Sequence, residues 1–319
     1  MQGLEVIAPG LHTTLQDLGR IGFQDIGLPA SGPLDRVSLR LANALVGNAS
    51  NTPALEILLQ GPTLKVAADS VRVALAGTGA EIEIRSGTPR RVPPGRTVTL
   101  ARDEVFRVGV LADSVCAYLA IEGGPDVAPV LGSVSTYPRG RIGGLNGSRF
   151  QRGDVVPLRL ARATARAEHE LAKAPGLALD QPIRVILGPQ ADYFTEEAVR
   201  TFLSSEYVVS PQSDRMGFRL EGPELRHAKG YNIVSDGIVT GSVQVPGSGK
   251  PIVLMVDNQT TGGYPKIATV ISADVPVIGR RKPGRAVRFT AVEVEEAGRL
   301  RREQETAIEL ECSAIRPLP

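Results

Sequence analysis

The chain is poor in cysteine, histidine and aromatic residues. Its 319 residues include two cysteines, three histidines and no tryptophan, and aromatic residues make up 4% of the total. Cys116 and Cys312 lie far apart and form no metal-ligand pattern, so we expect no disulfide framework, as in a reducing compartment. The histidines lie in separate contexts without a HExxH pair, which argues against a zinc site.

Strong net charge and long apolar runs are also absent. The formal net charge is +2, which does not indicate the basic footprint of a nucleic-acid-binding protein. No apolar run approaches the roughly 20 residues that span a bilayer. Residues 1–10 lack the basic segment and apolar core of a signal peptide. We therefore expect a cytoplasmic protein with no nucleic-acid partner and no membrane partner.

Glycine and proline, by contrast, are abundant, with 35 and 24 residues. Short runs of Val, Ile and Leu lie between them, and this pattern predicts a mainly β protein with a few helices. At roughly 150 residues per domain, we expect a β-rich domain over 1–160, a linker over 161–180 and a second domain over 181–319. The expected strands include 4–8, 54–59, 71–76, 81–85, 96–100, 105–111, 115–121 and 183–188.

Two segments have the pattern of helices. In 33–47, Pro33 suits a first helical position, and leucine and valine residues behind it share one face. Helical spacing of apolar residues also predicts a helix over 192–205. Residues 160–176 are polar and Ala-rich, and we expect them to connect the domains partly as a helix. Residues 121–153 form a long Gly-rich loop of the kind that often carries function.

Two short echoes connect the halves of the sequence. Residues 58–64 resemble 219–225 around a Gly-Pro pair, and 94–100 resemble 283–289 around Pro-Gly-Arg, in the same order. Short β-rich matches also arise by chance. A duplication and a coincidence therefore both stay open.

The first of three polar clusters lies in residues 13–36. Its glycines could bring backbone N–H groups to an anion, with Arg20 as the counter-charge and Asp17 and Ser31 nearby. The alternative is a structured loop before the helix, with Asp17 and Arg20 as a local pair. The residue pattern leaves both interpretations open.

The second cluster centres on Arg215, in a turn within residues 210–223. An arginine beside an apolar wall and a glycine could clamp a carboxylate or phosphate, or it could bind loop carbonyls. The nearby stretch 246–251 fails as a phosphate loop, because Gln244 takes the place of the first glycine and Pro251 that of the Ser/Thr. There we predict a hairpin turn.

The third cluster is "DNQTTGGYPK", residues 257–266, between the apolar runs 250–256 and 267–279 that we expect to be strands. It offers hydroxyls, an amide, free backbone N–H groups, a phenol and an ammonium, which is more than a plain turn needs. Such donors can bind an oxyanion, although an ornate turn remains the alternative. We expect residues 235–237, which include Asp236, to lie nearby.

Together these clusters resemble the allophanate hydrolase subunit 2 group, also described as the biotin-dependent carboxyltransferase family. The resemblance covers roughly residues 3–295, and the motifs that carry it are 13–35, 214–223 and 235–270. The turn at 246–250 departs from the Pro-Asp-Gly type expected there. The resemblance implies two tandem cyclophilin-like β-barrel domains.

The resemblance also implies an activity and partners. The leading function is the C-type subunit of an ATP-dependent 5-oxoprolinase, an amide (lactam) hydrolase that opens 5-oxo-L-proline to L-glutamate. It would act with a subunit-1 (B-type, KipI-like) protein and an A-type subunit, be inactive without them, and use ATP with Mg at the level of the complex. The alternatives are the carboxyltransferase half of a biotin-dependent urea carboxylase or allophanate hydrolase, and a KipA-like regulatory protein that antagonises a kinase inhibitor. In the carboxylase alternative another protein supplies carboxybiotin, because the chain lacks a Met-Lys-Met attachment signature.

Site residues follow from the clusters and the resemblance together. As catalytic groups we expect Lys266, Thr260 and Thr261 as donors to the substrate oxygen, and Asp236 for acid–base work. We expect Arg215 to hold a substrate carboxylate, and we expect no metal ligands. The further substrate-binding candidates are Gln259, Gly262, Gly263, Tyr264, Arg20, Asp17 and Ser31.

Overall fold

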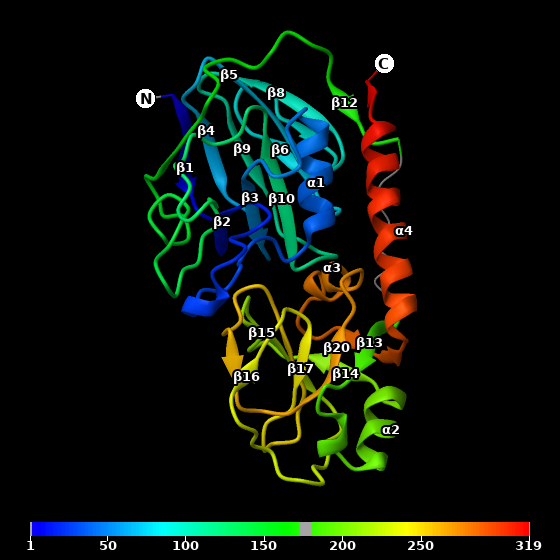
Figure 1. The fold of residues 1–319 in the computed structure, drawn as a ribbon. Coiled ribbons are helices and arrows are strands. Elements are labelled where there is room, and N and C mark those ends of the chain that lie inside the picture. Colours follow the sequence, from blue (N-terminus) through cyan, green and yellow to red (C-terminus); the bar gives the residue numbers. More distant parts are fainter. Residues whose placement is uncertain (1, 173–179, 319) are drawn as a thin grey trace. The chain divides into compact units, whose positions relative to one another are not determined.

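The computed structural model describes residues 2–172 and 180–318. Two compact units make up the chain. The first unit contains residues 1–20, 31–176 and 307–319, and the second contains residues 21–30 and 177–306. Both are mainly β, as predicted, and each has its own sheets (Figure 1).

Two antiparallel sheets form the first unit. Their strands are β1 (Gly3–Ala8), β2 (His12–Gln16), β3 (Ala54–Leu58), β4 (Thr63–Val66), β5 (Ser70–Ala76), β6 (Ile82–Ile84), β7 (Arg90–Val92), β8 (Thr97–Ala101), β9 (Val105–Val108), β10 (Cys116–Ile121) and β11 (Val155–Pro157). One sheet has the order β11-β1-β4-β9-β6-β7 and the other β2-β3-β10-β5-β8. Apolar residues of both sheets share one buried core, so the alternating pattern of the sequence matches the buried faces.

Helix α1 (Arg36–Leu45) packs on β10 and β5 of the five-stranded sheet (Figure 1). The side chain of Asp35 caps its first turn, where Oδ1 accepts the backbone N–H groups of Val37 at 2.9 Å and Ser38 at 3.1 Å. Such a cap satisfies donors that the helix itself leaves open. The predicted helix over 33–47 is confirmed, and it begins behind this cap.

A buried polar network lies at the start of α1. The Tyr118 hydroxyl donates to Glu56 Oε2 at 2.6 Å, and it accepts the backbone N–H of Asp35 at 2.9 Å. The backbone N–H of Leu34 also donates to Glu56 Oε2, at 2.9 Å. Burial and the Glu56 charge raise the pKa of Tyr118 well above its usual value. The phenol is therefore a neutral donor that this carboxylate needs.

A nearly closed barrel forms the second unit. Its strands are β13 (Ile183–Leu187), β14 (Tyr207–Val209), β15 (Gly217–Glu221), β17 (Ser242–Gln244), β18 (Ile252–Leu254), β20 (Lys266–Val270), β21 (Ala286–Val287) and β22 (Phe289–Ala291). The sheet order is β21-β14-β15-β18-β17-β20-β13-β22. The two edge strands, β21 and β22, are separated only by Arg288, so the chain itself links the two ends of the sheet.

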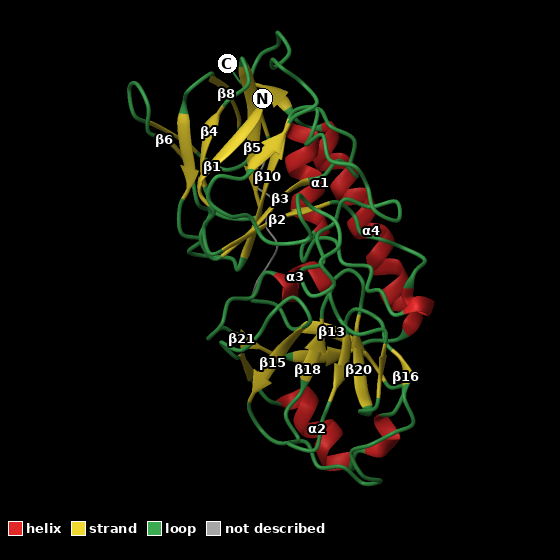
Figure 2. Ribbon diagram, turned by 90° about the vertical axis from the view of Figure 1, so that its left-hand side faces the viewer, coloured by secondary structure: helices red, strands yellow, loops and turns green. Residues whose placement is uncertain are grey.

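Helix α2 (Glu196–Ser204) lies along one side of this sheet (Figure 2). It follows the 3-10 turn η2 (Ala191–Tyr193). The helix predicted over 192–205 therefore consists of this turn at its start and α2 over most of the remainder. The Thr195 hydroxyl caps α2 by accepting the backbone N–H of Ala198 at 3.1 Å. Phe202 of α2 stacks on Phe289 of β22, with ring centroids 4.5 Å apart.

Replacement of tyrosine by phenylalanine should have opposite effects on the free energy of unfolding at two buried positions. The Tyr207 hydroxyl is buried without a hydrogen-bond partner among the described residues, and burial raises the pKa of Tyr207 to about 12. We expect Tyr207→Phe to raise the free energy of unfolding by about 1 kcal/mol, because an unpaired buried hydroxyl is removed. We expect Tyr118→Phe to lower it by about 2 kcal/mol, because Glu56 then loses a donor. Urea unfolding of both variants measures this, and a loss of stability in Tyr207→Phe would contradict it.

The strand predicted over 267–279 is wrong in its second half. β20 ends at Val270, and Val275–Gly279 form the short helix α3, with Pro276 in its first turn. Proline has no N–H for a strand ladder, but it fits the first turn of a helix. The apolar run was continuous because α3 buries Ile278 and β20 buries Ile267.

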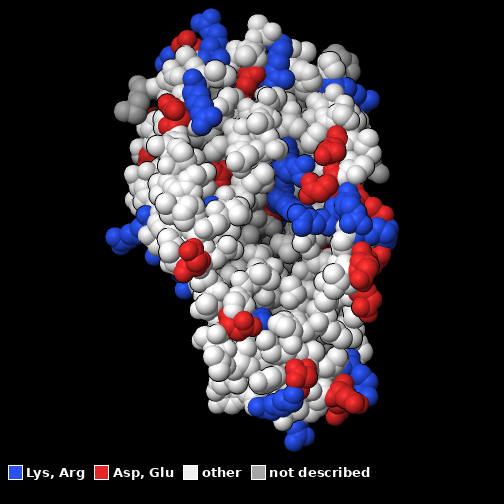
Figure 3. Space-filling model, viewed as in Figure 1, with Lys and Arg blue, Asp and Glu red and all other residues white. Residues whose placement is uncertain are grey.

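Helix α4 (Val294–Ser313) was not anticipated. Ile308 is its one buried residue among the described ones, so the sequence has no apolar stripe there to indicate a helix. Acidic and basic side chains interleave along it, as Figure 3 shows at the edge where α4 runs, and Arg299 pairs with Glu296 and Glu303. In the described part of the chain no helix is long and apolar enough to cross a membrane.

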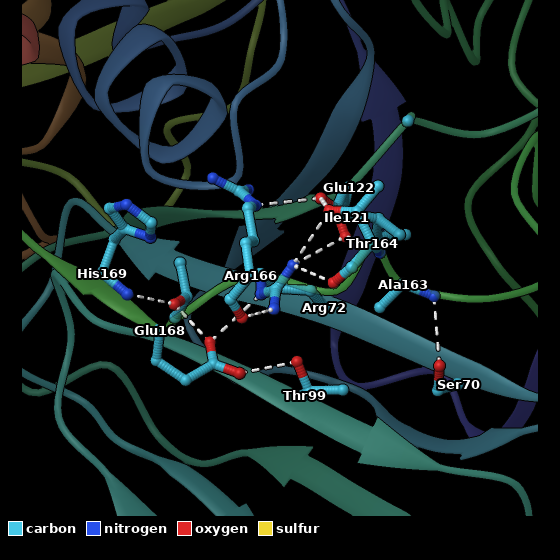
Figure 4. A network of polar contacts seen from close by, with 12 residues as sticks. Ser70, Arg72, Thr99, Ile121, Glu122, Ala163, Thr164, Arg166, Glu168 and His169 are labelled. Carbon is cyan, nitrogen blue, oxygen red and sulfur yellow. Dashed lines mark hydrogen bonds and ion pairs between the residues drawn. The ribbon is translucent and has the colours of Figure 1, made fainter. Parts of the chain in front are cut away.

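The expectation of a partly helical linker is wrong for residues 161–172, and residues 173–179 lie outside the described ones. A network around Arg72 holds this stretch on the first unit (Figure 4). Arg72 contacts Glu122 at 3.0 Å, Glu168 at 3.2 Å and the carbonyl oxygen of Arg166 at 2.8 Å. Residues 161–172 of the expected linker are therefore part of the first unit.

The end of the chain returns to the same place in the first unit. Strand β12 (His169–Glu170) pairs with β23 (Arg316–Pro317). Arg316 Nη2 contacts Glu170 Oε1 at 3.0 Å, and Arg96 Nη2 contacts Glu170 Oε2 at 2.9 Å. The carboxyl-terminal strand thus belongs to the first unit.

Candidate functional site

The stretch 257–265 is a crossover that connects β18 to β20. β18 and β20 are not neighbours in the sheet, because β17 lies between them. Within the crossover, β19 (Thr261–Gly262) pairs with β16 (Asp236–Gly237), in a small sheet of its own. The expected proximity of 235–237 to this stretch is confirmed.

Lys266 places its ammonium inside this arrangement. It is the first residue of β20, and its side chain is 3% exposed. The Nζ atom donates to Asp236 Oδ2 at 2.6 Å and to the carbonyl oxygen of Gly237 at 3.3 Å. A buried ammonium needs such partners. Among the described residues these two contacts use two of its three N–H donors, which leaves one for a ligand.

Asp236 is the exposed member of this pair. Its side chain is 49% exposed, so the carboxylate faces solvent as well as Lys266. The hydrogen bond from Lys266 lowers the pKa of Asp236, with further contributions from the Gly237 N–H and the Gln190 amide. A carboxylate with a lowered pKa is a weaker base, so the geometry favours Asp236 as the counter-ion of Lys266 over acid–base work.

Backbone contacts hold the rest of the crossover. The carbonyl oxygens of Thr260 and Gly263 accept N–H groups from Ile238 at 3.0 Å and Ile233 at 2.8 Å. Gly262 is tightly enclosed, because a Cβ atom there would lie 2.5 Å from Ile238 Cδ1. The backbone of 260–263 is thus fixed against 233–238.

The exposed side chains of the crossover are those with hydrogen-bonding groups. Gln259, Thr261 and Tyr264 are exposed, while the carbonyl oxygen of Tyr264 accepts Nε2 of the buried Gln244 at 3.3 Å. This crossover therefore exposes an amide, a hydroxyl and a phenol, and Thr261 pairs with Gly237, the residue after Asp236. Such a set of groups can bind a polar ligand.

Arg215 forms a buried ion pair with Asp257 in the second unit. Its Nε donates to Asp257 Oδ2 at 2.8 Å and its Nη2 to Asp257 Oδ1 at 3.1 Å, and both side chains are 5% exposed. The backbone N–H of Asp257 donates to the Arg215 carbonyl at 2.9 Å. The geometry favours a role in fixing the start of the crossover over the expected role of holding a substrate carboxylate.

The candidates from the first cluster belong to the first unit. Asp17 accepts the Ser133 hydroxyl at 2.6 Å, and Arg20 donates to the Ser133 carbonyl at 3.3 Å, so both bind the segment 130–135. Both side chains are buried. Ser31 is also buried, with φ at +53°, and its hydroxyl has no partner among the described residues. These contacts favour the structured-loop interpretation for Asp17 and Arg20.

Two residues in the second unit were missed. Gln190 contacts both Lys266 and Asp236, and Gln244 supports the crossover. Gln190 follows a strand and a Gly-Pro pair, and nothing in that local pattern marks a site. In the described part of the chain, no three His, Cys, Asp or Glu side chains are grouped to hold a metal.

The predicted hairpin turn at 246–251 is confirmed. β17 and β18 pair as an antiparallel hairpin, and the Gly249 N–H donates to the Pro246 carbonyl at 2.9 Å. The ammonium of Lys250, the lysine of the apparent phosphate motif, pairs with Glu221. The residues of this turn therefore do not fit a nucleotide phosphate site.

Comparison with known proteins points to one family. The family model described as "Carboxyltransferase domain, subdomain A and B" matches residues 26–291. The chain is 38% identical to the C-type subunit of 5-oxoprolinase from Escherichia coli, over 96% of both chains. It is 35% identical to the protein of the same name in Haemophilus influenzae, over 95% of both chains. The match to urea amidolyase of Saccharomyces cerevisiae, at 32% identity, covers 96% of this chain and 17% of the yeast protein.

Solved structures give a consistent picture of the fold. The urea carboxylase of Kluyveromyces lactis superimposes with a TM-score of 0.88 at 30% identity, over 100% of this chain and 30% of that one. The crystal structure of TTHA0988 superimposes with a TM-score of 0.80 at 36% identity, over 91% of this chain and 55% of that one. In both structures the matching region is part of a longer chain.

Proposed function

The chain belongs to the carboxyltransferase-domain family with subdomains A and B, and from this premise we propose that it is the C-type subunit of a 5-oxoprolinase. The observation that carries this proposal is the 38% identity to the Escherichia coli protein of that function over 96% of both chains. The urea enzymes contain the same region as a small part of much longer chains. The reaction is the opening of the lactam of 5-oxo-L-proline to L-glutamate.

Lys266 is the group that best suits this chemistry. Attack of a nucleophile on the lactam carbonyl carbon moves the C=O π electrons onto the carbonyl oxygen, which becomes negatively charged. The ammonium has one N–H left by the described contacts with Asp236 and Gly237. A charged donor in a mostly buried position stabilises such an oxygen strongly. The exposed Thr261 hydroxyl and the Thr260 hydroxyl are the further donors that we propose.

The partners and ATP belong to the assembled enzyme. We propose that it is completed by a KipI-like B-type protein and an A-type subunit, and that this chain is inactive alone. The turn at 246–250 does not fit ATP phosphates, because Lys250 is paired with Glu221. We therefore place the binding of ATP and Mg with the complex, and no step of the reaction is assigned to them in this chain.

A carboxyltransferase role is the second candidate. The yeast urea amidolyase and the Kluyveromyces lactis urea carboxylase contain the same region at 32% and 30% identity. In that role another protein would bring carboxybiotin, and the lysine and hydroxyl donors of 260–266 would polarise a urea-type substrate. The lower identity, and the small share of those proteins that the match covers, make this the weaker candidate.

Reconstitution tests the proposed function. We expect glutamate release from 5-oxo-L-proline and ATP when this chain is mixed with its A and B partners, and no release when any one of the three is omitted. The measurement is glutamate formed with time, with complex formation checked by size-exclusion chromatography. An inactive complete mixture in which this chain still binds its B-type partner would reject the proposal and favour the carboxyltransferase role.

A further inference from the structure

Gln190 connects the main chain of Lys266 with the carboxylate that the Lys266 ammonium contacts. Its Nε2 donates to Asp236 Oδ2 at 3.2 Å, and its Oε1 accepts the backbone N–H of Lys266 at 3.2 Å. The backbone N–H of Gln190 donates to the Lys266 carbonyl at 3.1 Å. Gln190 thus forms two hydrogen bonds with the backbone of Lys266 and one with the Asp236 carboxylate.

The direction of the Gln190 amide is set by these contacts. Its oxygen must face the Lys266 N–H, so its NH2 group must face the carboxylate. Asp236 Oδ2 therefore receives two donors, the Gln190 amide and the Lys266 ammonium at 2.6 Å. Asp236 Oδ1 takes a third, the Gly237 N–H at 2.8 Å.

This fixation matters because Asp236 lies in an exposed place. Its side chain is 49% exposed, and its strand β16 has two residues. A side chain in such a position keeps rotamer freedom unless hydrogen bonds restrict it. Without the Gln190 amide, the Asp236 carboxylate could contact the Lys266 ammonium in more than one rotamer.

We propose that Gln190 is a positioning residue for the lactam-opening reaction, which locks the Asp236 carboxylate and thereby aims the Lys266 ammonium at the substrate oxygen. The inference rests on the proposed function. Gln190 itself touches no reacting atom in this scheme. It acts through the pair, and misplacement of a catalytic donor by a fraction of an ångström lowers the rate without changing substrate binding.

The charges around Asp236 allow a selective test. Lys266 is its titratable partner among the described contacts, and Asp192 of η2, two residues beyond Gln190, is paired with Lys229. In Gln190→Glu, the introduced carboxylate can still accept the Lys266 N–H, but its second oxygen faces Asp236 Oδ2. Two carboxylates that share a site raise the pKa of one of them.

The first arm of the test uses the chain alone. The carboxyl carbon of Asp236 is titrated by ¹³C NMR and assigned with Asp236→Asn, in the unaltered chain, Gln190→Glu, Gln190→Met and the control Gln212→Glu. Gln212 is exposed on the same unit. We expect the Asp236 midpoint to rise by about one pH unit in Gln190→Glu, by less in Gln190→Met, and not in the control. An unchanged midpoint in both Gln190 variants overturns the proposal.

The second arm uses the complex with its A and B partners. We expect kcat for glutamate release to fall about tenfold in Gln190→Met while KM for 5-oxo-L-proline stays the same, because ground-state binding is untouched. In Gln190→Glu the acid limb of the pH profile should move to higher pH. Rates equal to the Gln212→Glu control overturn the proposal. If the unaltered complex releases no glutamate, the proposed function fails, whereas the NMR titration still decides whether Gln190 fixes Asp236.

Discussion

Replacement of Arg215 by methionine should lower the free energy of unfolding by about 3–5 kcal/mol, because it leaves the buried Asp257 carboxylate without its bidentate partner. The two side chains are both 5% exposed, so water cannot replace the lost guanidinium. Chemical denaturation of the purified chain measures the loss. The double variant Arg215→Met/Asp257→Leu should recover most of it, since no charge is then left buried.

A surface pair is the matched control for Arg215. Arg288 contacts Glu206 at 2.9 Å, but their side chains are 66% and 47% exposed. Arg288→Met should therefore cost about 1 kcal/mol or less. The opposite result for Arg215→Met, normal stability with a raised KM for 5-oxo-L-proline, would restore the role of a substrate clamp that its sequence context suggested.

Local patterns in the sequence predicted the elements of the sheets but not their order. The short apolar runs 71–76 and 115–121 mark strands: alternate residues such as Val73 and Leu119 lie in the core, and the residues between them are also buried. Nothing in "KPIVLMV" or "KIATV" says that β17 separates them, because strand order depends on contacts that are distant along the chain. For this reason the local pattern could not show that 257–265 is a crossover.

In the candidate site, too, local patterns predicted some residues but not the contacts between distant parts of the chain. The polar stretch 257–266 and Asp236 could be singled out because they carry more hydrogen-bonding groups than a turn needs. The pairing of Arg215 with Asp257 and the contact of Gln190 with Lys266 could not be predicted, because each joins residues that are distant along the chain. Single polar residues between strands have no local signature of such contacts.

The repeated Pro-Gly-Arg motif illustrates what a short match can establish. Gly95 and Gly284 both have left-handed backbone, with φ at +77° and +83°. Each precedes a strand, β8 and β21. A left-handed turn position favours glycine in any β protein, so the shared conformation accounts for the shared glycine whether or not the halves arose by duplication.

Replacement of Lys266 by methionine should reduce glutamate release by the assembled enzyme about 100-fold, the usual effect of removing one donor to a developing oxyanion. The free energy of unfolding of the chain should change much less in Lys266→Met than in Arg215→Met, because the remaining Asp236 carboxylate is 49% exposed and can be solvated. The measurements are the initial rate in the complex with A and B partners and the denaturation midpoint of the chain.

Lys250→Met is the control for Lys266, because Lys250 also pairs with a carboxylate in the second unit but lies in an exposed turn. It should leave the rate unchanged. A Lys266 variant that forms the complex and keeps the rate of this control would reduce the 257–266 stretch to a structural crossover. If the rate is lost with Lys266 and kept in Asp236→Asn, the ammonium acts without its counter-ion. Loss in both variants would instead identify the pair as the working unit, since the ammonium then needs the carboxylate to hold its direction.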